Sequence, residues 1–279
     1  MLLRMGDGRG TLEISLVGTV LAVAMIGAAE LGYRAYVLWG RDRPERDVAG
    51  ISLIISATLT LMGLLIAFTF GIAQTRYELR RTLTVAEASA ISTTFLRQQM
   101  LPLPQRERLR ALMRDYVAAR RAEVSNGKDH RAAAAGWRQT TAVQSRIWDD
   151  TVEALDAPET VRITQSLLAA TNDMFNVAQA RHAALEESIP DRAVRVLLAF
   201  VIGVSILMGV GLAAHGSRRL VTSSAMFILI AVAMSLIHDL DTPNSGDIRA
   251  SAGAMDQVAM EVSSQGATSN AAAGHTQAP

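Results

Sequence analysis

The feature that most constrains this chain is one uninterrupted stretch, residues 51–81, with the sequence ISLIISATLTLMGLLIAFTFGIAQTRYELRR. Its first part, from Ile51 to Gln74, carries no charge and is long enough to cross a bilayer, since about 20 apolar residues at 1.5 Å each span about 30 Å of hydrocarbon. Its second part is basic and amphipathic, and no proline separates the two parts. The stretch therefore predicts a single helix that leaves the membrane and continues into water.

Three further uncharged runs lie at Ile14–Ala29, Val196–Ala214 and Leu220–Ile237. The first is extended by LGYRAYVLW, whose aromatic side chains suit the belt at a membrane surface. This run is long for the apolar core of a signal peptide and lacks a small-residue cleavage site, which favours an uncleaved anchor. We therefore expect four membrane spans.

The spans fall into two hairpin pairs on either side of a polar insert. The predicted domains are residues 1–74 for the first pair, 75–191 for a water-exposed helical domain, 192–249 for the second pair and 250–279 for a disordered tail. The tail is predicted from its Ala, Ser, Gly, Asn, Thr and Gln content. The predicted fold class is all-α: four transmembrane helices in two hairpin pairs, with a water-exposed helical insert that continues from the second span.

The insert shows helical periodicity in three segments. The first begins after Pro102 and ends near Ser125, and its apolar residues recur at intervals of three and four: Leu109, Leu112, Met113, Tyr116 and Val117. The second carries Val143, Ile147, Trp148, Val152 and Leu155. The third is opened by a capping-box spacing from Asp156 to Glu159, bears Leu167, Met174, Ala178 and Leu185, and ends near Pro190.

Composition excludes several classes of function. The chain contains no cysteine, so disulfides, thiolate chemistry and cysteine–zinc sites are ruled out. Its formal net charge of +1 gives no support for nucleic-acid binding. Four of its histidines, His130, His182, His215 and His238, share no ligand spacing, and no catalytic triad, phosphate loop or carboxylate pair stands out. We expect no enzyme and no cofactor, with calcium the one ion to consider below.

Four sequence blocks carry a resemblance to a known family: GLLIAFTFGIAQTRYELRRTLTVAEASAISTTFLRQQMLP, RERLRALMRDYVAAR, TNDMFNVAQARHAALEESIP and IHDLDTPNSGDIRAS. Together they cover roughly residues 51–251 and resemble a bacterial family of unknown function called bestrophin-like. That family is distantly similar to the bestrophins, which are pentameric ion channels. The resemblance implies a multi-pass protein of the bacterial inner membrane, surrounded by the lipid bilayer, assembled as a homo-oligomer, with a pentamer suspected, and conducting small inorganic ions.

The resemblance also implies where a pore would lie. In bestrophins the second membrane helix forms a narrow apolar neck and then enters a basic segment, and Arg76-Tyr77 stands at the place of an Arg-Trp pair. Phe68 and Leu64 fall at neck positions, and Thr60 lies one turn further. Ile72 extends this face at the same spacing of four. In an oligomer the face could form a hydrophobic constriction, although ordinary helix packing would use such a face as well.

Charged residues follow this helix. Arg76, Arg80 and Arg81, with Glu78 and Glu87, are predicted to form a charged collar at the pore mouth. A vestibule that concentrates anions is one interpretation. Attraction of these arginines to lipid headgroups is the other.

Two acidic positions lie after the last span. Asp239 and Asp241 begin a stretch that resembles the acidic Pro-Phe-Gly loop of bestrophins, with Asn244 in place of Phe, and their carboxylates could bind calcium. A simple turn, in which Asp241 caps the backbone or pairs with Arg76 or Arg80, is the alternative.

One ionisable residue lies within the first span. Glu30 is followed four residues later by Arg34, so we expect an intrahelical ion pair rather than a functional site.

The leading function is therefore a bestrophin-like ion channel. The alternative is a membrane-anchored sensory or scaffolding protein whose helical insert binds a partner. A transporter is less favoured because no span has a core broken by glycine and proline. With four spans, both termini and the insert share one side, which we take as cytoplasmic. Arginines in the two short hairpin loops favour the opposite orientation.

Overall fold

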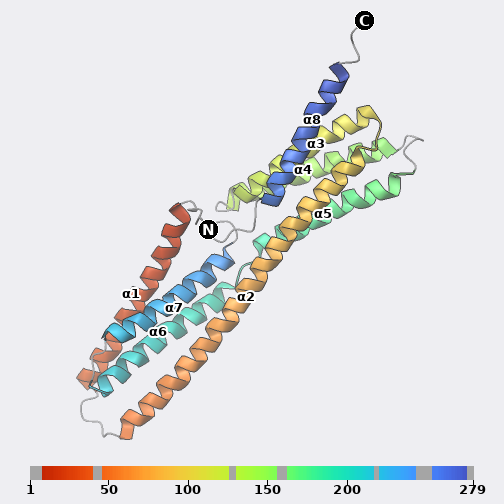
Figure 1. Cartoon of the computed structure of the whole chain (residues 1–279). Coiled ribbons are helices and arrows are strands. Elements are labelled where there is room, and N and C mark those ends of the chain that lie inside the picture. Colours follow the sequence, from red (N-terminus) through yellow and green to blue (C-terminus); the bar gives the residue numbers. More distant parts are fainter. Residues whose placement is uncertain are drawn as a thin grey trace. The chain divides into compact units, whose positions relative to one another are not determined.

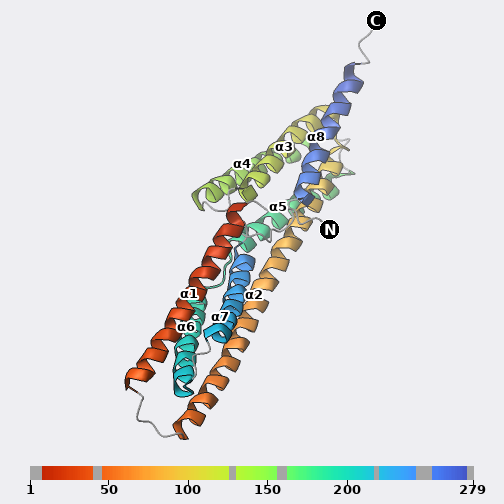
Figure 2. The same cartoon turned by 60° about the vertical axis from the view of Figure 1, so that its left-hand side comes forward.

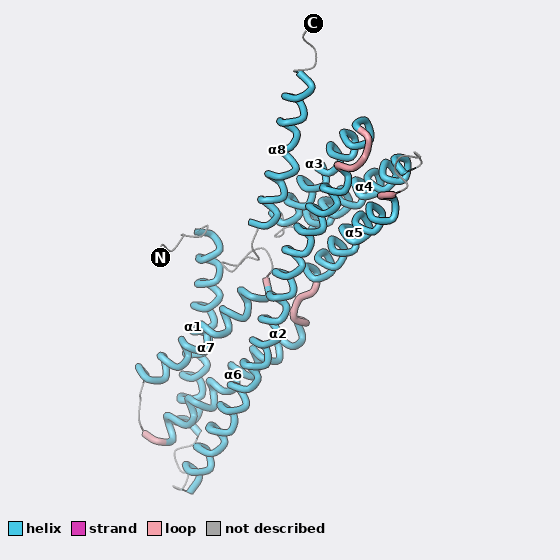
Figure 3. The backbone as a smooth tube through the Cα atoms, turned by 45° about the vertical axis from the view of Figure 1, so that its right-hand side comes forward, coloured by secondary structure: helices cyan, strands magenta, loops and turns pink. Residues whose placement is uncertain are grey.

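The computed structural model describes residues 8–39, 46–125, 130–155, 162–216, 220–242 and 253–274. These residues form helices joined by loops and contain no strand (Figure 1, Figure 3). The predicted all-α class is confirmed. Four stretches are long and apolar enough to span a membrane, starting at Leu16, Ala49, Thr164 and Thr222, which agrees with the predicted count. The longest uncharged runs in the second and third stretches are residues 49–75 and 196–214.

Helix α2 runs without a break from Arg46 to Gln98, 53 residues, which corresponds to about 80 Å at 1.5 Å per residue. The prediction of one helix that joins an apolar and a polar half is confirmed. Within residues 51–74 the structure buries only Ile55, Met62 and Ala73. The described part of the chain therefore leaves most side chains in the apolar half of α2 uncovered.

The chain divides into two compact units. The first, here called the membrane unit, comprises Met1–Tyr77 and Ser188–Thr242. It contains α1 (Gly8–Trp39), the apolar half of α2, α6 (Asp191–Ala214) and α7 (Leu220–Asp241). Helix α1 packs along α6 and α7, as two views show (Figure 1, Figure 2). Two apolar clusters fill the unit, one around Met25 and Phe227 and the other around Ala73 and Met234.

Close backbone contact joins α1 to α6. A Cβ atom built on Gly209 would lie 1.8 Å from the carbonyl oxygen of Ala29, and one built on Gly32 would lie 2.1 Å from that of Ile206. Both positions therefore require glycine. Small residues that let helix backbones approach are the usual means of packing membrane helices, because lipid tails provide no hydrophobic drive.

The second unit, here called the helical unit, comprises Glu78–Glu187 and the segment that begins at Arg249. It contains the polar half of α2 with α3 (Leu103–Ser125), α4 (His130–Leu155), α5 (Thr164–Glu186) and α8 (Gly253–Gly274). Most of the predicted apolar stripe residues are buried in its core, which also contains residues of α2 and α8. Val152 is an exception, with 42% of its surface exposed. The predicted capping box lies outside the described residues, and the described start of α5 is Thr164.

The prediction of a disordered tail is wrong for Gly253–Gly274, which form α8. Three of its four large apolar side chains, Met255, Val258 and Val262, recur at helical spacing and are buried in the core of the helical unit, and the fourth, Met260, is exposed. Two polar contacts add to this packing: Ser92 donates to Glu261 at 2.9 Å, and Arg121 pairs with Asp256 at 2.7 Å. The segment was predicted to be disordered because it is rich in small polar residues, but three of its few large apolar residues are spaced so that they form one buried face of a helix.

Candidate functional site

The predicted pore-constriction residues share one uncovered face of α2. Leu64, Phe68 and Ile72 have 48%, 64% and 51% of their surfaces exposed. Thr60 is also exposed, and its hydroxyl donates to the carbonyl of Ser56 at 2.9 Å within the same helix. The rest of the described chain leaves this face open. In a membrane this face would contact lipid, water or another copy of the chain.

The three predicted pore-mouth arginines differ in exposure. Arg81 is exposed, Arg76 is half-buried and Arg80 is buried, with 3% of its surface exposed. One terminal nitrogen of Arg76 is buried without a hydrogen-bond partner among the described residues. In the single chain Arg81 is thus the member of the set with its charge most open to solvent.

Asp241 has a structural role. Both of its carboxylate oxygens accept the backbone N–H of Ile189 at 3.1 Å, which ties the end of α7 to the residues that lead into α6. Asp239 is buried. Among the described residues no three acidic or histidine side chains gather as metal ligands would. The rest of the predicted acidic loop, including Asp247, lies outside the described residues.

The predicted ion pair within the first span is confirmed. Arg34 donates through Nε to Glu30 at 2.9 Å, and the arginine side chain is largely exposed.

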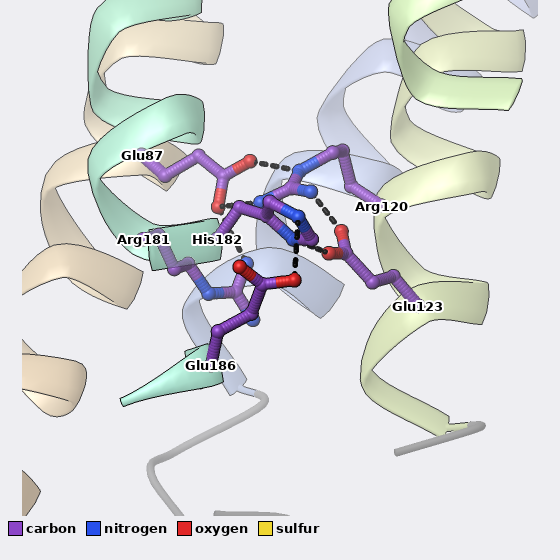
Figure 4. Close-up of polar contacts among 6 residues, drawn as sticks. All are labelled: Glu87, Arg120, Glu123, Arg181, His182 and Glu186. Carbon is purple, nitrogen blue, oxygen red and sulfur yellow. Dashed lines mark hydrogen bonds and ion pairs between the residues drawn. The ribbon is translucent and has the colours of Figure 1, made fainter. Parts of the chain in front are cut away.

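The helical unit contains a buried group of charged side chains that the sequence did not reveal (Figure 4). Arg120 of α3 donates through Nε and Nη2 to the two carboxylate oxygens of Glu87 on α2, and its Nη1 donates to Glu123. Arg181 of α5 donates to the same Glu87 carboxylate. We call this group the polar cluster; its buried members are Glu87, Arg120, Glu123 and Arg181, and His182 and the exposed Glu186 lie at its edge.

Glu87 is the centre of the polar cluster and has no exposed surface. Burial alone would raise its pKa, but the hydrogen bonds and charges of Arg120 and Arg181 outweigh this effect and hold the pKa below its ordinary value. The carboxylate is therefore ionised between two guanidinium groups. Glu87, predicted to stand in a charged collar with Arg76 and Arg81, instead lies buried in the helical unit and pairs with Arg120 and Arg181.

His182 borders the polar cluster beside Trp137 of α4. The two rings stack, with centroids 3.9 Å apart and planes inclined by 6°. Nδ1 of His182 lies 2.9 Å from a Glu123 oxygen, and Nε2 lies 3.5 Å from a Glu186 oxygen. Burial lowers the pKa of His182, the charge of Glu186 raises it and that of Arg120 lowers it, with a net decrease.

The buried members, Glu87, Glu123, Arg120 and Arg181, have two carboxylates and two guanidinium groups and a formal charge of zero, whereas the Glu186 side chain is 73% exposed. The members of the polar cluster come from α2, α3 and α5, so their ion pairs bind the polar half of α2 to two other helices. The neighbouring Tyr116 hydroxyl is buried without a partner at hydrogen-bond geometry among the described residues. Burial raises the pKa of this phenol well above its ordinary value, and the charge of Glu87 adds to the increase. The phenol therefore stays neutral.

The polar cluster as a whole cannot be predicted from residue spacing, because most of its contacts join residues that are far apart in the sequence. Glu87 and Arg181 are 94 positions apart, and Arg120 and Glu87 are 33 apart. Two pairs, Arg120–Glu123 and His182–Glu186, have a helical spacing that sequence reasoning could have found.

The fold and these sites define a class: an α-helical membrane protein with an uncovered apolar face on α2 and a buried ionic cluster in its helical unit. The model of the bestrophin-like domain matches residues 21–255, and the chain belongs to the bestrophin-like family. No curated protein matches the chain in sequence.

Two crystal structures resemble the chain in fold. One is described as a membrane protein; it is 14% identical, with a TM-score of 0.62, over 90% of this chain and 98% of that one. The other is a bacterial bestrophin homologue from Klebsiella pneumoniae with a single substitution. It is 14% identical with a TM-score of 0.61, over the same shares of the two chains.

Proposed function

We propose that this protein is a bestrophin-like ion channel, in which copies of the chain assemble so that α2 lines the pore. The observation that carries the proposal is the uncovered face of α2. Leu64 and Phe68 are both about half or more exposed on a helix long enough to cross the membrane. Family membership and the fold shared with a bestrophin homologue support the same conclusion.

Leu64 and Phe68 would form the constriction. Around a symmetry axis, apolar side chains from several copies narrow a pore and expel water, which closes it to ions until the ring widens. Thr60 continues this face toward the N-terminus of α2 and supplies a hydroxyl. Because that hydroxyl donates to Ser56, its remaining polar capacity toward the pore is that of an acceptor.

Arg76 and Arg81 would lie at the aqueous mouth of the pore, where positive charge raises the local concentration of anions. The buried Arg80 is a weaker candidate for this role. We place the protein in the bacterial inner membrane, with the helical unit and both termini on the cytoplasmic side.

Planar-bilayer recording of the purified full-length protein tests the proposal, together with measurement of its mass in detergent. The expected result is ion conductance from a homo-oligomer. A monomeric protein without conductance in chloride, sodium or potassium salts would overturn the channel and favour a sensory or scaffolding protein whose helical unit binds a partner.

A further inference from the structure

A cavity of about 460 Å³ lies within the membrane unit, between the first turns of α2 and the last turns of α6. Its volume is within the range of about 300–1,000 Å³ that is usual for small-molecule sites. None of its described lining residues belongs to the predicted constriction or to the polar cluster. The lining residues are Ser52, Ile55 and Ser56 of α2 with Met208, Gly211, Leu212 and His215 of α6.

The lining of the cavity changes from polar to apolar along the helices. His215 directly follows α6, whose last residue is Ala214, and Ser52 lies close to the start of α2. These two polar side chains contact each other, with Nε2 of His215 3.4 Å from the hydroxyl oxygen of Ser52. Met208 precedes His215 by seven residues, about 10 Å along the helix at 1.5 Å per residue. The polar end of the cavity therefore lies at the helix ends, and its apolar end lies deeper in the span.

The polar end is held in place by α6 itself. Nδ1 of His215 lies 2.8 Å from the carbonyl oxygen of Gly211, a contact in which this nitrogen carries the proton. The imidazole is thereby oriented with Nε2 toward Ser52 on the other helix. Gly211 also lets Ile55 of α2 approach closely, since a Cβ atom built on the glycine would lie 2.3 Å from the end of the Ile55 side chain. One wall of the cavity is thus formed before any ligand arrives.

Ser56 adds an unused hydrogen-bond donor to the cavity. Its side chain is exposed, and its hydroxyl has no hydrogen-bond partner among the described residues. Its backbone carbonyl accepts the hydroxyl of Thr60, a contact that leaves the Ser56 side chain unpaired. Ser56 lies within the uncharged run of residues 49–75, where an unpaired hydroxyl in hydrocarbon is unfavourable. Its partner must therefore come from outside the described chain.

We propose that this cavity binds one phospholipid of the surrounding membrane. The headgroup would lie beside His215 and Ser52, and an acyl chain would follow the apolar wall toward Met208. A phospholipid has the same order of polarity along its length, with polar groups at the membrane surface and hydrocarbon below. Its phosphate and ester oxygens accept hydrogen bonds, which is what the Ser56 hydroxyl offers. None of the described lining residues is acidic, so no carboxylate repels the phosphate.

The apolar side chains favour a lipid over a water-soluble solute. Ile55, Met208 and Leu212 line the deeper part of the cavity, where a free phosphate ion would lose its hydration without gaining polar partners. An acyl chain fills such a wall at no cost in hydration. The inference is independent of ion conduction, because the cavity is formed by two helices of a single chain.

Native mass spectrometry of the full-length protein in detergent, with added phosphatidylglycerol, measures lipid bound per chain. The unsubstituted protein should retain one lipid per chain. Ser56→Trp places a ring in the cavity and should abolish this retention. Ile54→Trp is the matched control, because Ile54 lies at the same depth on α2, is 57% exposed and does not line the cavity. His215→Ala should weaken retention about two- to tenfold, the usual net effect of one hydrogen bond. Circular dichroism should show equal helical content in all variants.

Photolabelling locates the bound lipid. Phosphatidylglycerol with a diazirine near the end of one acyl chain should label the peptide that contains Met208 after irradiation. The label on this peptide should disappear in Ser56→Trp and persist in Ile54→Trp. Glycerol 3-phosphate, which has the phosphate without acyl chains, should not displace the label.

Four results would overturn the inference. Equal lipid retention in Ser56→Trp and the unsubstituted protein would place the lipid elsewhere, as would labelling confined to peptides of α7. Displacement by glycerol 3-phosphate would assign the cavity to a soluble phosphate. Retention of lipid by the monomer but not by an oligomer would show that a second copy fills the cavity. Each of these results leaves the proposed channel standing, because conductance is measured separately.

Discussion

Trp137 and His182 stack face to face at the edge of the polar cluster, with ring centroids 3.9 Å apart. The contact joins α4 to α5 and places the imidazole between the carboxylates of Glu123 and Glu186. Arg120 lies close as well, with its guanidinium carbon 5.6 Å from the centre of the Trp137 ring. The protonation state of one histidine therefore bears on how three helices of the unit pack.

Acid should destabilise the helical unit through His182. The pKa of His182 lies below its ordinary value, chiefly because of burial, whereas an unfolded histidine has a pKa of about 6.5. The unfolded chain consequently binds the proton more readily. The contribution of His182 to the free energy of unfolding is constant well above pH 6.5 and falls as the pH drops through that value.

Thermal unfolding of the protein and of His182→Phe, measured between pH 8 and pH 5.5, checks this prediction. Phenylalanine preserves a ring to stack on Trp137 but cannot take up the proton. The substituted protein should lose less stability on acidification than the unsubstituted one. Equal losses in the two proteins would contradict the assignment to His182.

Removing the charge of Glu87 should destabilise the helical unit strongly. Glu87→Gln leaves Arg120 and Arg181 buried without their common carboxylate partner, and breaking a buried pair in this way costs about 3–5 kcal/mol. Glu153→Gln is the matched control, because Glu153 pairs with Arg108 at 2.8 Å while both side chains are half-exposed or more. Circular dichroism melting curves should show a large decrease for the first variant and little change for the second.

The crossing of α1 and α6 should not tolerate a methyl group at Gly209. The added Cβ would lie 1.8 Å from the backbone oxygen of Ala29, so the helices must separate at a cost of about 1–3 kcal/mol or more. Gly203→Ala on the same helix meets no atom within 4 Å and should be neutral or slightly stabilising. The thermal midpoint and yield of folded protein in detergent measure the difference. Similar values for the two variants would show that this close contact is absent in the protein.

Helix α8 should contribute to the stability of the helical unit. Val262 has 1% of its surface exposed, so Val262→Asp buries a carboxylate at a cost of more than about 2 kcal/mol. Met260→Asp places the same group where 65% of the surface is exposed and should cost little. Limited proteolysis of both variants should cleave the first much faster. Equal resistance would indicate that α8 does not pack as described.

The features that were predicted correctly depend on residues that are close together in the sequence. An uncharged run identifies each span, and the continuity of α2 follows from length, composition and the lack of proline. The Glu30–Arg34 pair follows from one helical spacing. Packing between distant segments cannot be predicted in this way. The ion pair between Arg181 and Glu87 joins residues 94 positions apart, and the fold of α8 depends on a core supplied by other helices.

The spacing of residues in α2 also predicted that this face is apolar, but it could not predict that the face is exposed. Leu64 and Phe68 could equally have packed inside the membrane unit. The structure shows that they do not, because α1 packs on α6 and α7 and the face of Phe68 stays exposed.

The central claim is that this face of α2 forms the constriction of an ion-conducting pore. Bilayer recording of Phe68→Ala tests it most directly, with Leu229→Ala as the control. Leu229 is an apolar residue of α7 with 70% of its surface exposed. The account predicts that Phe68→Ala increases conductance or the time spent open, because a smaller ring admits water, and that Leu229→Ala conducts as the unsubstituted protein does. Currents unaltered by Phe68→Ala would contradict the assigned constriction.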